Sequence, residues 1–443
     1  MDSWRGVSVP DLPGRGPEPR IFDTASGELA AATAGGDATL YACGITPYDA
    51  THIGHAATFL AWDLLVRAWR DAGHHVTYVQ NVTDVDDPLL ERAARDGEGW
   101  RELADREIDR YRADMAALRV LPPTRLVGAV EALGVIERFA GRLAERGALY
   151  GVDGDEYFAR ASDEAFGSVS GLDTGEMLEL FAERGGDPGR PGKKDPLDAL
   201  VWLAARPNEP AWGSRFGQGR PGWHVECAAI STEYLGTTFD VQAGGTDLIF
   251  PHHEMSASHA RVALEPGAFA RRYAHAGMVR LDGEKMSKSL GNLVFVSRLL
   301  AEGHDPMAVR LAILAHHYRE DWDWTAAGLF AAADRLARWR EAVQVAPAPA
   351  PARPGAAPPA AALLPAAAPP AASRAAGEAV LAAVRERLAD DLDAPGALAA
   401  VDAWADDVLG GDQDGAGPAS AAAASPAAEL VRDTVDALLG VML

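Results

Sequence analysis

The sequence predicts an α/β fold in which a doubly wound, Rossmann-like parallel sheet carries an insertion and a C-terminal helical region. Short apolar runs with β-branched and aromatic residues occur at 38–42, 76–82 and 239–242, and helical periodicity follows them. Strands that alternate with helices are typical of a parallel sheet. Polar and glycine-containing segments come after these runs, at the edge where open α/β sheets bind ligands.

The patterns predict further elements along the chain. They are helices at 56–72, 89–118, 125–150 and 307–343, a last strand at 273–279, and a polar, glycine-rich insertion at 153–199 that crosses the ligand-binding face. We expect seven segments: an N-terminal extension (1–35), the first half of the Rossmann-like domain (36–124), a connective insertion (125–219), the second half of that domain (220–300), a helical region (301–344), an Ala/Pro linker (345–377) and a C-terminal helical bundle (378–443).

Composition limits the function classes. The 443 residues carry a net charge of −23, which disfavours a large polyanionic partner, although a local basic patch could still bind one. No apolar run reaches transmembrane length, and the N-terminus lacks the apolar core of a signal peptide. Two cysteines are too few for a disulfide scaffold, and free thiols suit a reducing compartment. We therefore expect a cytoplasmic protein.

The stretch from Cys43 to His55 has the layout of a strand, a turn and a helix start. The free N–H groups and the dipole of a helix N-terminus favour an anion. Gly54 would let a phosphate approach the backbone closely, and His52 and His55 can donate to phosphate oxygens. The alternative is that the two histidines are simply solvated at a helix start. This HIGH tetrapeptide is a weak signal by itself.

Lysine occurs at only four positions, namely 193, 194, 285 and 288. Lys285 and Lys288 fall inside the pentapeptide KMSKS, which suggests that these positions need an ammonium rather than a guanidinium. A solvated surface loop is the alternative. The HIGH and KMSKS motifs together resemble those of the class I aminoacyl-tRNA synthetases. This resemblance implies that ATP is a substrate, with Mg²⁺, and that His52, His55, Lys285 and Lys288 act on its phosphates.

Two sets of residues are candidate metal ligands. Asp84, Asp86 and Asp87 follow the strand at 76–82, but an acidic helix start is the commoner explanation for them. Cys43, Cys227 and His252 are far apart in sequence and lack the spacing of a zinc motif. Each of these three could instead be a buried core residue. Their expected positions at strand ends and helix starts bring them toward one edge of the sheet.

Longer motifs make the resemblance closer. CGITPYDATHIGH, NVTDVDDP, GRPGWHVECAAIS, GGTDLIFPHHE and KMSKSLGN, within about 36–325, resemble segments of the cysteinyl-tRNA synthetases and of the related ligases that join cysteine to glucosaminyl-inositol in mycothiol biosynthesis. The resemblance implies one zinc ion on Cys43, Cys227 and His252 that recognises the substrate thiol. It also implies an adenylate site made of Cys43, Gly44, Ile45, Thr46, Thr58, Asn81, Val82, Thr83, Trp223, Gly245, Thr246, Asp247 and Val279.

Three departures from the synthetase pattern favour the ligases. Ser256 stands where the synthetases have a further zinc-binding glutamate. The segment 378–443 carries 13 acidic and 3 basic residues in place of an anticodon-binding region, and residues 183–188 (ERGGDP) resemble a ligase segment. We therefore expect an ATP-dependent ligase that joins L-cysteine to the amine of glucosaminyl-inositol through cysteinyl-adenylate, as a monomer without nucleic acid or membrane. A cysteinyl-tRNA synthetase and a non-catalytic sensor are the alternatives.

Overall fold

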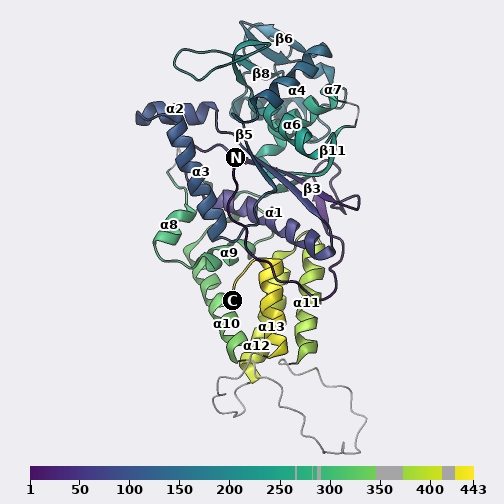
Figure 1. The fold of residues 1–443 in the computed structure, drawn as a ribbon, viewed down its shortest axis with the longest axis vertical. Coiled ribbons are helices and arrows are strands. Elements are labelled where there is room, and N and C mark those ends of the chain that lie inside the picture. Colours follow the sequence, from purple (N-terminus) through teal and green to yellow (C-terminus); the bar gives the residue numbers. More distant parts are fainter. Residues whose placement is uncertain (265–266, 282, 287–290, 346–372, 412–424) are drawn as a thin grey trace, which may run out of the picture.

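The computed structural model describes residues 1–264, 267–281, 283–286, 291–345, 373–411 and 425–443, with a parallel sheet at the centre (Figure 1). In spatial order its strands are β12 (Phe269–Ala276), β11 (Thr238–Gly245), β3 (Ala38–Ile45), β4 (Val76–Val82) and β5 (Arg125–Gly128). All neighbouring pairs are parallel. The predicted fold class is confirmed, and the order reverses between β3 and β11, where ligands bind in doubly wound sheets.

Side-chain alternation along β3 separates two cores. Leu40 and Ala42 belong to one core, whereas Tyr41 and Cys43 belong to the other. The first core contains the buried face of α1 (Ile53–Ala72). The strand period therefore directs the Cys43 thiol away from α1.

Three helices cover the other face of the sheet. They are α4 (Leu133–Glu145), α6 (Trp223–Leu235) and α7 (Glu254–Ala263), whose buried residues share a core with Cys43. Figure 1 shows these helices on the side of the sheet opposite to α1. Because α6 packs directly on β3 and β4, Cys227 lies on the helix next to the Cys43 strand.

The predicted helices have different bounds in the structure. The helix predicted over 56–72 is α1, which begins three residues earlier, at Ile53. The segment 89–118 forms two helices, α2 (Asp87–Asp96) and α3 (Trp100–Ala117), because Gly97 ends α2 in the left-handed conformation. The prediction of one helix over 125–150 is wrong. Its first residues form β5, whose four residues are too few for a periodicity signal, and only α4 is helical.

The insertion folds into its own antiparallel sheet. In spatial order the strands are β6 (Leu149–Val152), β7 (Asp155–Phe158), β8 (Ala199–Ala204), β10 (Gly217–Pro221) and β9 (Trp212–Ser214). The short helix η1 (Arg160–Ser162) and α5 (Thr174–Glu183) connect β7 to β8. The stretch 153–199, which was predicted as a polar, glycine-rich insertion, thus contains β7, η1, α5 and the first residue of β8.

Smaller elements complete the part of the chain that contains the sheets. They are the N-terminal hairpin β1 (Arg20–Asp23) and β2 (Glu28–Ala31), η2 (Thr246–Leu248), η3 (Ile249–His253), the sheet of β14 (Glu284–Lys285), β13 (Val279–Leu281) and β15 (Trp322–Asp323), and α8 (Val296–Ala301). The predicted last strand at 273–279 thus divides into the end of β12 and the start of β13.

Helices form the C-terminal part of the chain, below the sheet in Figure 1. They are α9 (Pro306–Leu314), α10 (Ala326–Val345), α11 (Arg374–Ala389), α12 (Ala394–Gly411), α13 (Pro426–Thr434) and η5 (Val435–Leu439). The single helix predicted over 307–343 is wrong, because β15 interrupts it. Most of the predicted linker, 346–372, lies outside the described residues. The division of the chain into domains stays a prediction, and among the described residues no helix is long and apolar enough to cross a membrane.

A buried ion-pair network joins α1, α9 and the C-terminal end. Arg67 Nε donates to Asp63 Oδ2 at 2.8 Å, and Arg310 also donates to this carboxylate; all three side chains are fully buried. Arg310 Nε donates to the carbonyl of Leu439 at 2.6 Å, and Arg67 Nη1 to that of Ala437 at 3.0 Å. Burial lowers the pKa of Arg310 to about 10, so this guanidinium remains charged at neutral pH.

The substitution Arg310→Met tests this network. It would leave Asp63 with one cationic partner and the Leu439 carbonyl without its donor, so we expect a loss of about 3–5 kcal/mol in unfolding free energy. As a control, Arg298→Met removes an ion pair between side chains that are 75% and 48% exposed, and should cost less than about 1 kcal/mol. Urea unfolding followed by tryptophan fluorescence measures both; equal losses would contradict the role of the buried network.

Candidate active site

A cavity of about 910 Å³ opens at the carboxyl ends of the parallel strands. Most residues predicted for the adenylate line it: Cys43, Gly44, Ile45, Thr46, Thr58, Trp223, Gly245, Asp247 and Val279, together with His52 and His55. Asn81, Val82, Thr83 and Thr246 are not among its lining residues. For Lys285 the structure gives a backbone position in β14 beside Arg280, whereas Lys288 lies outside the described residues.

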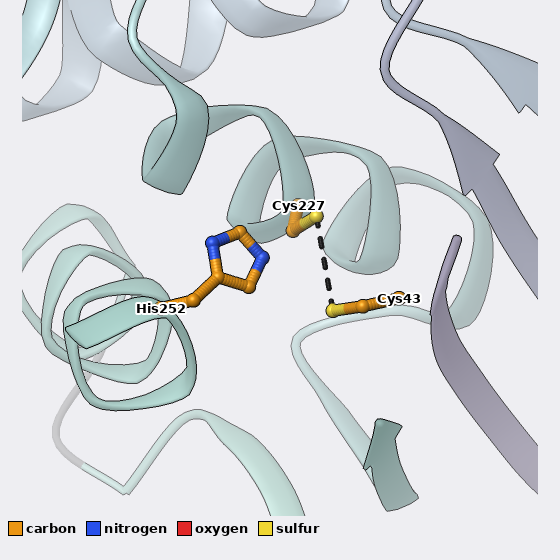
Figure 2. A group of neighbouring side chains, drawn as sticks. All are labelled: Cys43, Cys227 and His252. Carbon is orange, nitrogen blue, oxygen red and sulfur yellow. Dashed lines mark hydrogen bonds between the residues drawn. The ribbon is translucent and has the colours of Figure 1, made fainter. Parts of the chain in front are cut away.

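The three predicted metal ligands come together, with their ligand atoms within 4.8 Å of one another (Figure 2). Cys43 Sγ and Cys227 Sγ are 3.9 Å apart. Two thiolates at about 2.3 Å from a tetrahedral zinc ion would be about 3.8 Å apart, so this spacing fits zinc. Within the described part of the chain, this is the only group of three or more Cys, His, Asp or Glu side chains that could share a metal ion.

His252 is oriented for ligation. Its Nδ1 is 3.1 Å from Nδ1 of His224, and burial lowers the pKa of both rings, so one neutral ring donates and the other accepts. Its buried Nε2 has no hydrogen-bond partner among the described residues. Figure 2 shows one ring nitrogen turned toward the two sulfur atoms. A metal ion would give His252 Nε2 a partner, while the hydrogen bond between Nδ1 and His224 would fix the orientation of the ring.

A second pair of buried histidines reaches Cys43 from the other side. His253 Nε2 is 3.2 Å from Cys43 Sγ, and its Nδ1 is 2.7 Å from His275 Nε2. His275 Nδ1 is in turn 2.6 Å from Thr24 Oγ1. Burial lowers the pKa of both rings, and neutral rings can be assigned so that each donates once, with His253 donating to the sulfur. Such a donor stabilises a thiolate.

Ser256 does not join the metal-ligand group. Its buried Oγ donates to the backbone carbonyl of His224 at 3.1 Å. This bond helps to hold the start of α6, where Trp223 stacks on His252 with ring centroids 4.2 Å apart. Three protein ligands are what a site with one open position for a substrate requires.

Close contact between β3 and β4 shapes the floor of the cavity. Gly44 N donates to Asn81 Oδ1 at 2.9 Å, and a Cβ on Gly44 would lie 1.6 Å from the Asn81 carbonyl oxygen. Glu226 accepts from Asn81 Nδ2 at 2.8 Å and from Thr83 Oγ1 at 2.9 Å. Burial raises the pKa of Glu226 to about 8. Asn81 and Thr83 therefore support the cavity floor from below.

The N-terminus of α1 brings the two histidines together, and its first turn is partly capped, because His55 N donates to His52 Nδ1 at 3.4 Å. His52 is the N-cap, and its ring stacks on that of His55 with centroids 3.8 Å apart. A Cβ on Gly54 would lie 2.9 Å from the His52 ring. Ile53 N donates to the carbonyl of Val294 at 2.8 Å, so the chain just after the KMSKS segment is bonded to the start of this helix.

The aspartates of TDVDDP have structural roles. Asp86 caps α2 by accepting from Asp87 N at 2.9 Å, and Asp84 accepts from Val130 N at 2.9 Å. Asp87 forms an ion pair with Arg220, which also lies 3.3 Å from Glu209. The acidic helix start was thus the better interpretation of these residues.

Sequence reasoning missed four residues that support the site: His224, Glu226, His253 and Arg184. The first three are each adjacent in sequence to a predicted site residue, and the strand and helix periods could have placed them in the core. Arg184 Nη1 donates to the carbonyl of Asp247 at 2.5 Å and also to that of Phe250. No sequence pattern links the insertion to η2 and η3, so this bond could not be foreseen.

Comparison with known proteins gives the class and then the family. Residues 30–334 match the family model of the class I (C) tRNA synthetase catalytic domain, so the chain has that domain. A solved methionyl-tRNA synthetase of Mycobacterium tuberculosis, in complex with methionyl-adenylate, shares the fold with a TM-score of 0.58 and 17% identity, over 91% of this chain and 90% of that one.

Two curated relatives are far closer. Both carry the name L-cysteine:1D-myo-inositol 2-amino-2-deoxy-alpha-D-glucopyranoside ligase. The protein from Thermomonospora curvata is 58% identical over 100% of both chains, and that from Parafrankia sp. is 58% identical over 100% of this chain and 93% of its own. The chain belongs to this ligase family, known also as the mycothiol ligases.

The substitution Gly44→Ala tests the contact between β3 and β4. The added methyl group would overlap the Asn81 carbonyl, so we expect a loss of about 3 kcal/mol or more in unfolding free energy. Gly134→Ala is the matched control, because its Cβ would meet only Arg138 Nη1 at 3.7 Å on an exposed part of α4, and alanine should stabilise the helix by about 0.5–1 kcal/mol. A Gly44→Ala protein with the wild-type melting temperature would contradict this interpretation.

Proposed function

We propose that the protein catalyses the ATP-dependent ligation of L-cysteine to the amine of 1D-myo-inositol 2-amino-2-deoxy-α-D-glucopyranoside, called glucosaminyl-inositol here. The products would be the amide, AMP and diphosphate. The observation that carries this proposal is the presence of the Cys/His group and the histidine-capped start of α1 beside one cavity. A thiol site and a phosphate site are then within reach of one small substrate.

The metal in this proposal is zinc, one ion per chain, held by Cys43, Cys227 and His252. Zinc would supply a Lewis acid that binds the thiolate of substrate cysteine. Cys43 lines the cavity, so a substrate thiol in the cavity could reach a metal ion held there. Serine carries a hydroxyl, which is a far poorer ligand at neutral pH, so the same site would separate two nearly isosteric amino acids.

In the first proposed step the carboxylate of cysteine attacks the α-phosphorus of ATP, which is bound with Mg²⁺. Cysteinyl-adenylate forms and diphosphate leaves. His52 and His55 would donate to the phosphate oxygens at the start of α1, where the helix dipole favours negative charge. Lys285 and Lys288 would hold the leaving diphosphate. Asp247, which lines the cavity, would bind the ammonium of cysteine.

In the second step the amine of the sugar attacks the adenylate carbonyl and AMP leaves. The adenylate would lie along the predicted residues that line the cavity, with Asn81 and Thr83 supporting it from beneath Gly44. Stacking of Trp223 on His252 supports this arrangement, since it ties one wall of the adenylate site to the metal-ligand group.

The acidic C-terminal helices support a small acceptor over RNA. Their arginines are already paired with carboxylates: Arg385 with Asp71 at 2.7 Å, and Arg387 with Asp393 at 3.2 Å. RNA affinity requires cationic groups that neutralise phosphates. We propose that the protein acts in the cytoplasm as a monomer, without a nucleic-acid or membrane partner.

Elemental analysis tests the zinc site. The purified protein should contain one zinc ion per chain, and the Cys43→Ala, Cys227→Ala double variant should contain almost none. Ser256→Ala is the control and should keep its zinc, because that hydroxyl bonds a backbone carbonyl. Equal zinc in the wild type and the double variant would contradict the site.

Competition between acceptors tests the reaction. With ATP and radiolabelled cysteine, the label should enter glucosaminyl-inositol as an amide, while tRNA at the same concentration stays unlabelled. Cysteine-dependent exchange of diphosphate into ATP should proceed with no acceptor present. Label on tRNA alone, decreasing as salt rises, would favour a cysteinyl-tRNA synthetase, and no exchange at all would favour a non-catalytic sensor.

A further inference from the structure

We propose that the insertion contains the acceptor subsite, in which the carboxylate of Asp187 binds hydroxyl groups of a two-ring polyol. This inference rests on the proposed function, which supplies the acceptor. It assigns a role to a wall of the cavity that the adenylate residues do not form: Tyr157, Phe181, Asp187, Arg190, Leu200, Leu203 and Arg220 line that wall.

Part of the wall is one face of the antiparallel sheet, and the rest comes from α5 and the segment that follows it. Tyr157 on β7 pairs with Leu200 on β8, and Leu203 on β8 pairs with Arg220 on β10. Leu200 and Leu203 are three residues apart and would face opposite sides of a regular strand. The register shift between Glu156 and Tyr157 changes this alternation, which lets both leucines line the cavity.

Asp187 is held in a fixed orientation at one end of this wall. The ammonium of Lys193 donates to Asp187 Oδ1 at 2.8 Å, to the Pro196 carbonyl at 2.8 Å and to the Asp187 carbonyl at 3.3 Å. These three acceptors use all three N–H bonds of the ammonium. The Lys193 side chain is 2% exposed, whereas that of Asp187 is 38% exposed. The buried cation therefore presents an accessible carboxylate to the cavity.

Tyr157 and Arg190 hold the second oxygen. The hydroxyl of Tyr157 donates to Asp187 Oδ2 and accepts from Arg190 Nη1 at 2.7 Å. Arg190 also lies 2.6 Å from Asp155, which is fully buried. A carboxylate has about four lone-pair positions, and the protein uses two of them here, so two remain for hydroxyl donors.

The size and chemistry of the wall fit a two-ring polyol. From β7 to β10 there are two interstrand spacings, or about 10 Å, which is the length of two linked six-membered rings. Leu200 and Leu203 lie between the polar ends and can contact the C–H faces of the rings. The cavity volume of about 910 Å³ lies at the upper end of the usual range for ligand pockets, about 300–1,000 Å³.

The wall is bonded to the reaction centre. Arg184, on the same segment as Asp187, donates to the carbonyl of Asp247 at 2.5 Å, and Asp247 precedes the metal-ligand segment η3. Phe181 of α5 packs in one cluster with Phe250 of η3. An acceptor on Asp187 is therefore next to the place where its amine must react.

The test compares Asp187→Asn with Asp195→Asn. The amide introduced by Asp187→Asn would keep an oxygen for Lys193 and turn its NH2 group toward the Tyr157 hydroxyl, which can accept. It would lose the negative charge that strengthens bonds to hydroxyl groups, so we expect the KM for glucosaminyl-inositol to rise about tenfold or more. The fold-change in this KM should exceed any fold-change in the rate of cysteine-dependent diphosphate exchange. Asp195 belongs to the same insertion and pairs with Arg160 at 2.7 Å, but it does not line the cavity. Asp195→Asn should keep the wild-type acceptor KM.

A second pair of variants tests whether the change in KM comes only from a structural disturbance of the insertion. Arg190 and Arg206 both bind Asp155, at 2.6 Å and 2.8 Å, but only Arg190 lines the cavity. Arg190→Gln should raise the acceptor KM and Arg206→Gln should not. If the two variants of each pair changed the acceptor KM equally, while the wild type carried out both exchange and transfer, this inference would be overturned and the proposed function would stand. Absence of exchange in the wild type would overturn the proposed function and this inference with it.

Discussion

The buried carboxylate of Asp63 is the contact on which the arrangement of the protein depends. It lies on α1, between Arg67 of the same helix and Arg310 of α9, and these guanidiniums also bind carbonyls of the C-terminal end. The N-terminus of that same helix carries His52 and His55. Because a buried charge must keep its partners, the helix whose N-terminus carries these histidines is fixed to α9 and to the C-terminal end of the chain.

The site itself depends on the switch in strand order between β3 and β11. Cys43 is directed away from α1 by the strand period, and Cys227 meets it from α6. His252 follows β11, so the three candidate ligands come from three elements that share only this edge of the sheet. No short spacing in the sequence could encode such a group, because its members are joined by topology.

Much of this could be predicted from the sequence, for physical reasons. Strong periodicity identified β4 with the bounds that the structure shows, and it identified the end of α1 at Ala72. The errors occurred where the local signal is short or depends on long-range contacts. β5 has four residues, and the insertion strands pair with one another across loops. The bond from Arg184 to Asp247 joins residues 63 positions apart, which no local pattern records.

The four lysines of the chain lie in two different segments of the sequence. Lys285 and Lys288 attracted attention because they share a motif, while Lys193 and Lys194 carried no hypothesis. The structure gives Lys193 three acceptors in a buried pocket. A planar guanidinium would direct its N–H bonds differently, so this position also favours a compact ammonium. The chain has a net charge of −23 and only four lysines. One of them, the buried Lys193, orients the carboxylate of Asp187, which faces the cavity.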